Sequence, residues 1–218
     1  TYVPGSTKTD FVWADGPLTQ AMREGRPLFV DEGNRMPTKS FNVLQTAISA
    51  RAVTLLDRGS EVVTAEDGFL VVTAMNIGQA YAGVNMMDGA MVDRFETTIM
   101  FDYLDAKDES ELVQERTGID AQLADWMVAV AGDVRSQYLN RQLAGDLTPR
   151  GLIAWAQMTQ YFLANSPSKQ TQIAQVMTML PKCIWIPTVA GQDTHGRLNK
   201  DHEQVIQQII LNHKPTGL

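Results

Sequence analysis

The sequence predicts an α/β domain followed by a nearly all-helical one, with the change at about residue 104. Short runs rich in β-branched and apolar residues alternate with helical patterns before that point, and helical periodicity dominates after it. Two of the strand candidates end next to polar residues, which is typical of a parallel sheet that binds a ligand at the carboxyl ends of its strands. We therefore expect domains at residues 1–104 and 105–218.

The elements expected in the first domain are short. Gly16-Pro17 opens a helix and Gly25 closes it. Arg58-Gly59 lies between two β-rich runs and predicts a hairpin. The full set comprises a hairpin over 2–13, a helix over 17–24, a strand over 28–30, a helix over 37–50, the hairpin around 58–59, a strand over 69–74 and a short strand over 97–103.

In the second domain, Asp105 is expected to cap a helix that Gly118 closes, and Thr148-Pro149 to begin another. Apolar residues on one helical face predict a further helix over 123–138, and two more are expected over 168–180 and 200–212. Cys183 lies in an apolar run and is expected in the core or at an interface, as are the aromatic residues of the helix after Pro149: Trp155, Tyr161 and Phe162. No function is assigned to residues 182–197.

Composition limits the classes of function. Apolar residues make up 44% of the 218 and the formal charge is −7, which argues against nucleic acid as the main partner. No apolar run approaches the roughly 20 residues of a membrane span. A single cysteine excludes an internal disulfide and fits a reducing cytosol, so we expect a cytoplasmic protein. His195, His202 and His213 show no metal-ligand spacing with Cys183.

Polar side chains at four places along the chain suggest a nucleotide site. Asp31 and Glu32 end the strand in "LFVDEGNRMP", Asn76 follows the strand in "FLVVTAMN", Arg94 precedes the next expected strand, and Arg150 lies in the first turn of a helix. One carboxylate can hold Mg²⁺ and a second can deprotonate the attacking water, while arginines neutralise phosphate charge in the transition state. Taken singly, each feature has a simpler interpretation: the acidic pair can be a solvated turn, and Arg94 can form a surface ion pair.

Together these segments resemble the AAA+ ATPases of the MoxR-type branch, with the gas-vesicle and CbbQ/NorQ-like proteins nearest in character. "LFVDEGNRMP" looks like the Walker B segment, and "FLVVTAMN" is similar to the sensor 1 strand. "AMVDRFE" resembles the segment that carries the arginine finger, and "TPRG" the start of the sensor 2 helix. "FVWADGPLTQAMREG" looks like the stretch that runs into Walker B, and "ARAVTLLDRGSEVVTAEDG" like the hairpin before sensor 1. The resemblance covers about residues 1–165.

The resemblance implies a P-loop AAA+ core, with a parallel sheet, helices and β-hairpin insertions, followed by a helical lid. It implies ATP and Mg²⁺, with Asp31 on the metal and Glu32 activating water. Asn76 would position that water, Arg94 would reach a neighbouring subunit's γ-phosphate, and Arg150 would sense the nucleotide from the lid. Arg35 is either a structural ion-pair partner or an intersubunit contact.

Two departures qualify this expectation. The G-x-x-x-x-G-K-S/T motif that cradles phosphate is absent from the sequence, so we expect an N-terminally truncated AAA+ core, without its first strand and P-loop, that is inactive alone. Gly33 stands where the family usually has a larger residue.

The intact protein is expected to be an ATPase, a ring and in particular a hexamer, that remodels or matures a client, a von Willebrand-type domain protein being one candidate. No membrane partner is expected. A non-hydrolysing AAA+-like scaffold and a protein-binding module remain the alternatives.

Overall fold

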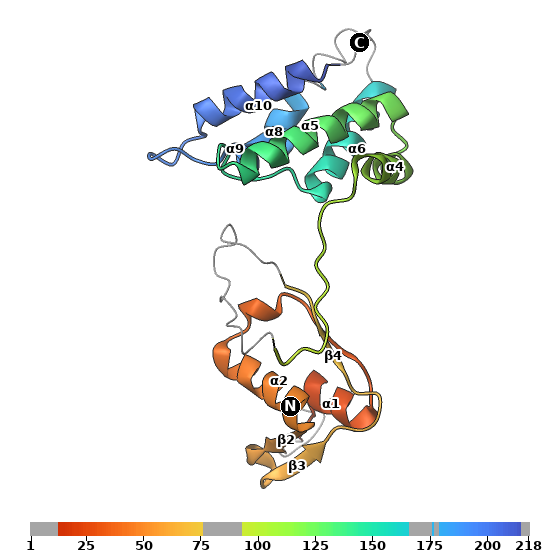
Figure 1. The fold of residues 1–218 in the computed structure, drawn as a ribbon, viewed down its shortest axis with the longest axis vertical. Coiled ribbons are helices and arrows are strands. Elements are labelled where there is room, and N and C mark those ends of the chain that lie inside the picture. The colour runs from red at the N-terminus through yellow and green to blue at the C-terminus, as the bar shows by residue number, and fades with distance from the viewer. Residues whose placement is uncertain (1–12, 76–92, 166–175, 177–178, 215–218) are drawn as a thin grey trace, which may run out of the picture. The chain divides into compact units, whose positions relative to one another are not determined.

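The computed structural model describes residues 13–75, 93–165, 176 and 179–214. The chain forms two compact units, Thr1–Ile99 and Met100–Leu218 (Figure 1). The hairpin expected over 2–13 and most of the helix expected over 168–180 lie outside the described residues.

The first unit contains a small parallel sheet, as predicted. Strand β1 pairs in parallel with β4, in the register Leu28↔Val71, Phe29↔Val72 and Val30↔Thr73. The expected hairpin is also present, as an antiparallel pair of β2 with β3 (Figure 1). The elements of this unit are α1 (Pro17–Glu24), β1 (Leu28–Val30), the 3-10 turn η1 (Gly33–Arg35), α2 (Thr38–Ala50), β2 (Ala52–Leu55), the 3-10 turn η2 (Leu56–Arg58), β3 (Glu61–Thr64) and β4 (Val71–Thr73).

Two glycines let the end of α1 approach the turn before β4. Gly25 and Gly68 both have positive φ, at 59° and 92°. A Cβ on Gly25 would lie 2.1 Å from the carbonyl oxygen of Asp67, and one on Gly68 would lie 2.5 Å from the carbonyl oxygen of Gly25. Only glycine fits such a close contact between backbones, so these two positions hold α1 beside the chain that enters the sheet.

Apolar residues of α1, α2 and the hairpin form the core of the first unit. Met22 of α1 is fully buried in it. At the surface, Arg23 bonds Asp15 at 2.9 Å and also contacts Glu61, which Arg58 bonds at 3.0 Å. A hydrogen bond from the Trp13 indole is the main cause that lowers the pKa of Asp15. This charged network links α1 to the start of β3.

The short strand expected over residues 97–103 is not formed. Ile99, Met100 and Phe101 are 68%, 71% and 90% exposed, and no described strand pairs with this segment. A strand depends on a ladder partner and on cross-strand side-chain contacts, which β-branched composition alone does not supply.

The second unit is helical, as predicted. Asp105, Asp120 and Asn199 each accept a backbone hydrogen bond at the N-terminus of a helix. Gly118 adopts φ 68° and ends the first of these helices. The helices are α4 (Ala106–Thr117), α5 (Ala121–Leu139), α6 (Pro149–Asn165), α8 (Leu180–Ile184), α9 (Ile186–Ala190) and α10 (Lys200–Asn212).

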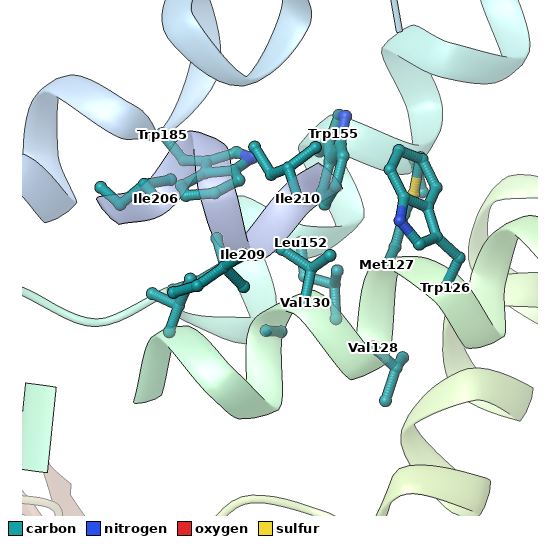
Figure 2. Close-up of a cluster of buried hydrophobic side chains, with 14 of the residues drawn as sticks. Trp126, Met127, Val128, Val130, Leu152, Trp155, Trp185, Ile206, Ile209 and Ile210 are labelled. Carbon is teal, nitrogen blue, oxygen red and sulfur yellow. The ribbon is translucent and has the colours of Figure 1, made fainter. Parts of the chain in front are cut away.

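Three tryptophans and a set of aliphatic side chains form the core of the second unit (Figure 2). The rings of Trp126 and Trp155 lie 5.1 Å apart at 67°, and those of Trp155 and Trp185 lie 5.5 Å apart at 56°. The first pair is edge-to-face and the second is tilted, and aromatic pairs of this kind add stabilisation beyond the burial of the rings. Ile206 and Ile210 of α10 are buried in the same cluster, so α10 completes the core.

The structure bears on two expectations about single side chains. Cys183 is exposed, because α8 turns Leu180 and Pro181 inward and Cys183 outward, so its expected place in the core is wrong and its place at an interface stays a prediction. Tyr161 is 61% exposed, whereas Trp155, six residues earlier on α6, is fully buried. An apolar run of sequence does not decide which side of a helix faces the core.

Residues 180–198 form α8, α9 and a turn closed by a bridge between Gln192 and Leu198. Lys182 of α8 and Lys200 of α10 both contact the buried carboxylate of Glu203, at 3.2 and 2.7 Å. The hydrogen bond from Lys200, followed by the one from Lys182, lowers the pKa of Glu203. No helix in the described ranges is both long and apolar enough to cross a membrane.

Candidate functional site

The Asp31-Glu32 pair lies just beyond the end of β1, beside the end of β4. The amide of Ala74 donates to the carbonyl of Val30 at 2.9 Å, and the amide of Gly33 donates to the carbonyl of Ala74 at 3.1 Å. Parallel pairing therefore brings residues 31–35, which we call the acidic turn, next to the chain that leads out of β4 toward Asn76. Asn76 itself lies outside the described residues.

The backbone of the acidic turn is tightly specified. The amide of Glu32 donates to Oδ1 of Asp31 at 2.9 Å, and the carbonyl of Glu32 accepts from the amide of Arg35 at 2.8 Å. Glu32 itself has φ 49° and ψ 42°, a left-handed conformation that is costly for a residue with a side chain. Residues held in such conformations cluster at functional sites, where the surrounding structure enforces them.

The carboxylate of Glu32 is accessible. Its side chain is 46% exposed and pairs with Nη1 of Arg35, which is 45% exposed, at 3.3 Å. An ion pair this exposed contributes little to stability. Glu32 can therefore exchange its partner for a water molecule or a ligand at small cost, and the structural pairing considered for Arg35 is present within the chain.

Gly33 lets the acidic turn lie directly on β4. A Cβ at this position would be 2.2 Å from Oγ1 of Thr73. That hydroxyl is buried and has no hydrogen-bond partner within the described part of the chain. The departure from the family pattern at Gly33 thus has a local physical cause, which is close contact with the last residue of β4.

We expect Gly33→Ala to destabilise the acidic turn by about 1–3 kcal/mol, because the new methyl overlaps a stiff β-branched side chain. Thr73→Ala removes the overlapping hydroxyl, so the double variant should recover most of the loss. Hydrogen exchange of the Leu28 and Ala74 amides, which join β1 to β4, measures the effect locally. Equal exchange in Gly33→Ala and the double variant would contradict the assignment of the overlap to Thr73.

Arg94 lies against α2. Its Nη1 donates to Oε1 of Gln45 at 2.8 Å, and Gln45 is 6% exposed. Arg94 as a whole is exposed, and among the described residues its guanidinium is tethered through Nη1 alone. Gln45 was not among the residues expected at the site, although its position four residues after the buried Phe41 on the same helical face marks it as a polar residue facing inward.

Arg150 belongs to the second unit and lies in the first turn of α6. It is exposed and forms no ion pair with any residue in the described ranges. A cation at a helix N-terminus is unfavourable against the macrodipole unless an anion is nearby. The hydroxyl of Thr148 accepts from the amide of Gly151 at 3.2 Å, which caps the turn that presents Arg150.

The donor set of the acidic turn suits a hard cation that keeps most of its water. No three His, Cys, Asp or Glu side chains converge anywhere in the described ranges, so no all-protein cage forms there. Mg²⁺ is commonly held by one or two carboxylates together with water and substrate phosphates. Asp31 and Glu32 fit that role for a nucleotide-bound ion.

Two segments of the chain match known families. Residues 3–95 match the AAA domain of the dynein-related subfamily, and residues 109–182 match the CbbQ/NirQ/NorQ C-terminal region. An uncharacterized protein of Staphylococcus saprophyticus is 33% identical over 108 residues, which is 50% of this chain and 40% of the relative.

Two other relatives cover more of the chain. An uncharacterized protein of Staphylococcus epidermidis is 30% identical over 136 residues, which is 62% of this chain and 51% of the relative. The protein NorQ of Paracoccus denitrificans is 31% identical over 125 residues, which is 57% of this chain and 45% of the relative. The chain thus spans about half the length of the curated relatives it matches.

Proposed function

Because the chain joins part of a dynein-related AAA domain to a CbbQ/NirQ/NorQ C-terminal region, and so belongs to this type of AAA ATPase, we propose that the whole protein is a Mg²⁺-dependent ATPase that remodels a partner protein. The observation that supports this most directly is the acidic turn. Asp31 and the accessible carboxylate of Glu32 follow β1 at the end of a parallel strand pair, where an α/β sheet binds its ligand.

We assign the chemistry as follows. Asp31 would hold Mg²⁺ together with water and phosphate oxygens, and the ion would neutralise charge on the triphosphate. Glu32 accepts a proton from the water whose oxygen bonds the γ-phosphorus, while the bond from that phosphorus to the bridging oxygen breaks and ADP leaves. Asn76 positions the water. The exposed side of Arg94 reaches the γ-phosphate held by a neighbouring subunit, and Arg150 contacts the nucleotide from the lid.

A role for Arg94 in a neighbouring site requires a ring, for which we propose six subunits. Arg35 is a second candidate at the subunit contact, where it would leave Glu32 for a partner. The client is a protein complex that needs maturation, with a von Willebrand-type domain protein as one candidate. The exposed single cysteine fits a protein that works in the reducing cytoplasm.

Residues 1–218 contain no G-x-x-x-x-G-K-S/T motif, and the curated relatives are about twice as long as the region matched. Backbone amides of that glycine-rich motif are what cradle the phosphates in P-loop enzymes. We therefore propose that these 218 residues do not hydrolyse ATP without a phosphate-binding segment.

Phosphate release from ATP, measured for the full-length protein and for residues 1–218 with and without Mg²⁺, tests the proposal. We expect Mg²⁺-dependent turnover by the full-length protein and none by residues 1–218. Turnover by residues 1–218 would contradict the need for a separate phosphate cradle. Nucleotide-dependent rings of the full-length protein that do not hydrolyse ATP would point instead to a scaffold, and the absence of nucleotide binding to a protein-binding module.

A further inference from the structure

A buried ion pair in the second unit joins α4 to α5. The guanidinium of Arg135 donates to both carboxylate oxygens of Glu109, at 2.6 and 2.8 Å, and the two side chains are 8% and 2% exposed. A bidentate pair of this kind fixes the plane as well as the position of the guanidinium. The remaining donor, Nε, bonds the carbonyl of Leu147 at 2.8 Å. Arg135 therefore holds the turn that precedes α6.

Tyr103 contacts this network from the segment that opens the second unit. Its ring centroid lies 3.8 Å from Cζ of Arg135, which is a cation–π contact. Its hydroxyl donates to the carboxylate of Asp146, the residue before Leu147. Tyr103 thus contacts both the arginine that holds the turn and the turn itself.

The turn held in this way leads directly to Arg150. Leu147 is fully buried, so its position is set by the core. A Cβ on Gly151 would lie 3.0 Å from Cδ1 of Leu147, and the Gly151 amide is bonded to the hydroxyl of Thr148. The first turn of α6 is therefore packed on Leu147, and the exposed Arg150 side chain projects from that same turn.

We propose that Tyr103 is a positioning residue for Arg150, acting through the contact of its hydroxyl with Asp146 and of its ring with Arg135. This inference rests on the proposed function, in which Arg150 contacts the nucleotide. The Glu109–Arg135 pair is buried enough to hold the helices together without Tyr103. Tyr103 is 39% exposed, so the hydrogen bond of its hydroxyl adds little to stability. Its main effect is to orient the Asp146–Leu147 turn.

A double-mutant cycle in the full-length protein tests this coupling. Tyr103→Phe keeps the ring over Arg135 and removes only the hydroxyl. We expect it to weaken binding of the fluorescent nucleotide mant-ATP about 2- to 10-fold, and to cause no further weakening in the Arg150→Ala background, because the two residues act on one contact. Tyr161→Phe is the matched control: it removes the same atom from an exposed residue of α6, the helix that carries Arg150, and should leave binding unchanged.

The outcomes separate the inference from the function on which it rests. If Arg150→Ala binds mant-ATP as the wild type does, the nucleotide-sensing role of Arg150 is wrong and the inference falls with it. If Arg150→Ala weakens binding but Tyr103→Phe either has no effect or adds its full effect in the Arg150→Ala background, only the inference is wrong. A purely structural role of the hydroxyl would produce that additive result, since destabilisation of the unit does not depend on Arg150.

Discussion

Glu32→Gln in the full-length protein is expected to lower ATP turnover by about 10²–10⁴-fold, the range that a positioned general base contributes, while ATP binding is retained. The amide of glutamine has nearly the shape of the carboxylate but cannot accept the proton of the attacking water. The side chain is 46% exposed, so the change should leave the fold intact. Steady-state phosphate release and equilibrium binding of mant-ATP, measured on the same preparation, separate the two effects.

Glu61→Gln provides a matched control for this prediction. Glu61 also pairs with an arginine three residues away, at 3.0 Å, and lies at the surface of the same unit. It has no place in the proposed chemistry, so its substitution should leave turnover close to that of the wild type. A comparable loss in both variants would assign the effect to surface charge, and unchanged turnover in Glu32→Gln would remove Glu32 from the mechanism.

Arg135→Met is expected to reduce the free energy of unfolding of the second unit by about 3–5 kcal/mol, because it leaves the Glu109 carboxylate buried without its partner. It also removes the donor to the carbonyl of Leu147. Urea unfolding of residues 1–218 followed by tryptophan fluorescence reports mainly on this unit, since Trp126, Trp155 and Trp185 lie in its core and only the exposed Trp13 belongs to the first unit.

Two further variants complete this test. Lys107→Met breaks the exposed pair of Lys107 with Glu111 on α4, 3.8 Å apart, and is expected to cost at most about 1 kcal/mol. Adding Glu109→Leu to Arg135→Met removes the unpaired charge and should recover part of the loss, because a buried ion pair is often no more stable than apolar residues of similar volume. A loss in Arg135→Met no larger than in Lys107→Met would mean that the pair is hydrated in solution.

Much of the local structure could be predicted because its causes are local. Gly16-Pro17 and Gly25 bound α1, Asp105 and Gly118 bound α4, and each of these residues acts on the backbone within a few positions of itself. A parallel sheet was also predicted, from two short apolar runs that each end next to polar residues, and in the structure these runs pair as β1 and β4. The prediction of a short strand over 97–103 was wrong for the opposite reason, since strand formation depends on a distant partner.

The candidate site, like the fold, has features that could be predicted from the sequence and features that only packing decides. Residue type and order along the chain were enough to propose Asp31, Glu32, Arg94 and Arg150, whose roles remain predictions. The contact of Arg94 with Gln45 could not be predicted, because those residues are 49 positions apart and only packing brings them together. For the Arg135 network, by contrast, the sequence did contain a signal. Arg135 lies four residues after the buried Ala131, on the apolar face of α5, where an unpaired charge would be costly, so its position indicates a buried partner.

The sequence by itself determined the order of the elements, most helix ends and the acidic pair at the end of a strand, because caps, turn residues and hydrophobic periodicity act over a few residues. Only the tertiary structure decided which side chains meet. It placed the hydroxyl of Thr73 against Gly33, and it closed Tyr103, Glu109, Arg135 and Asp146 into one network before Arg150. Buried polar groups must find partners, and which partners are within reach is a property of the packed core and not of the chain order.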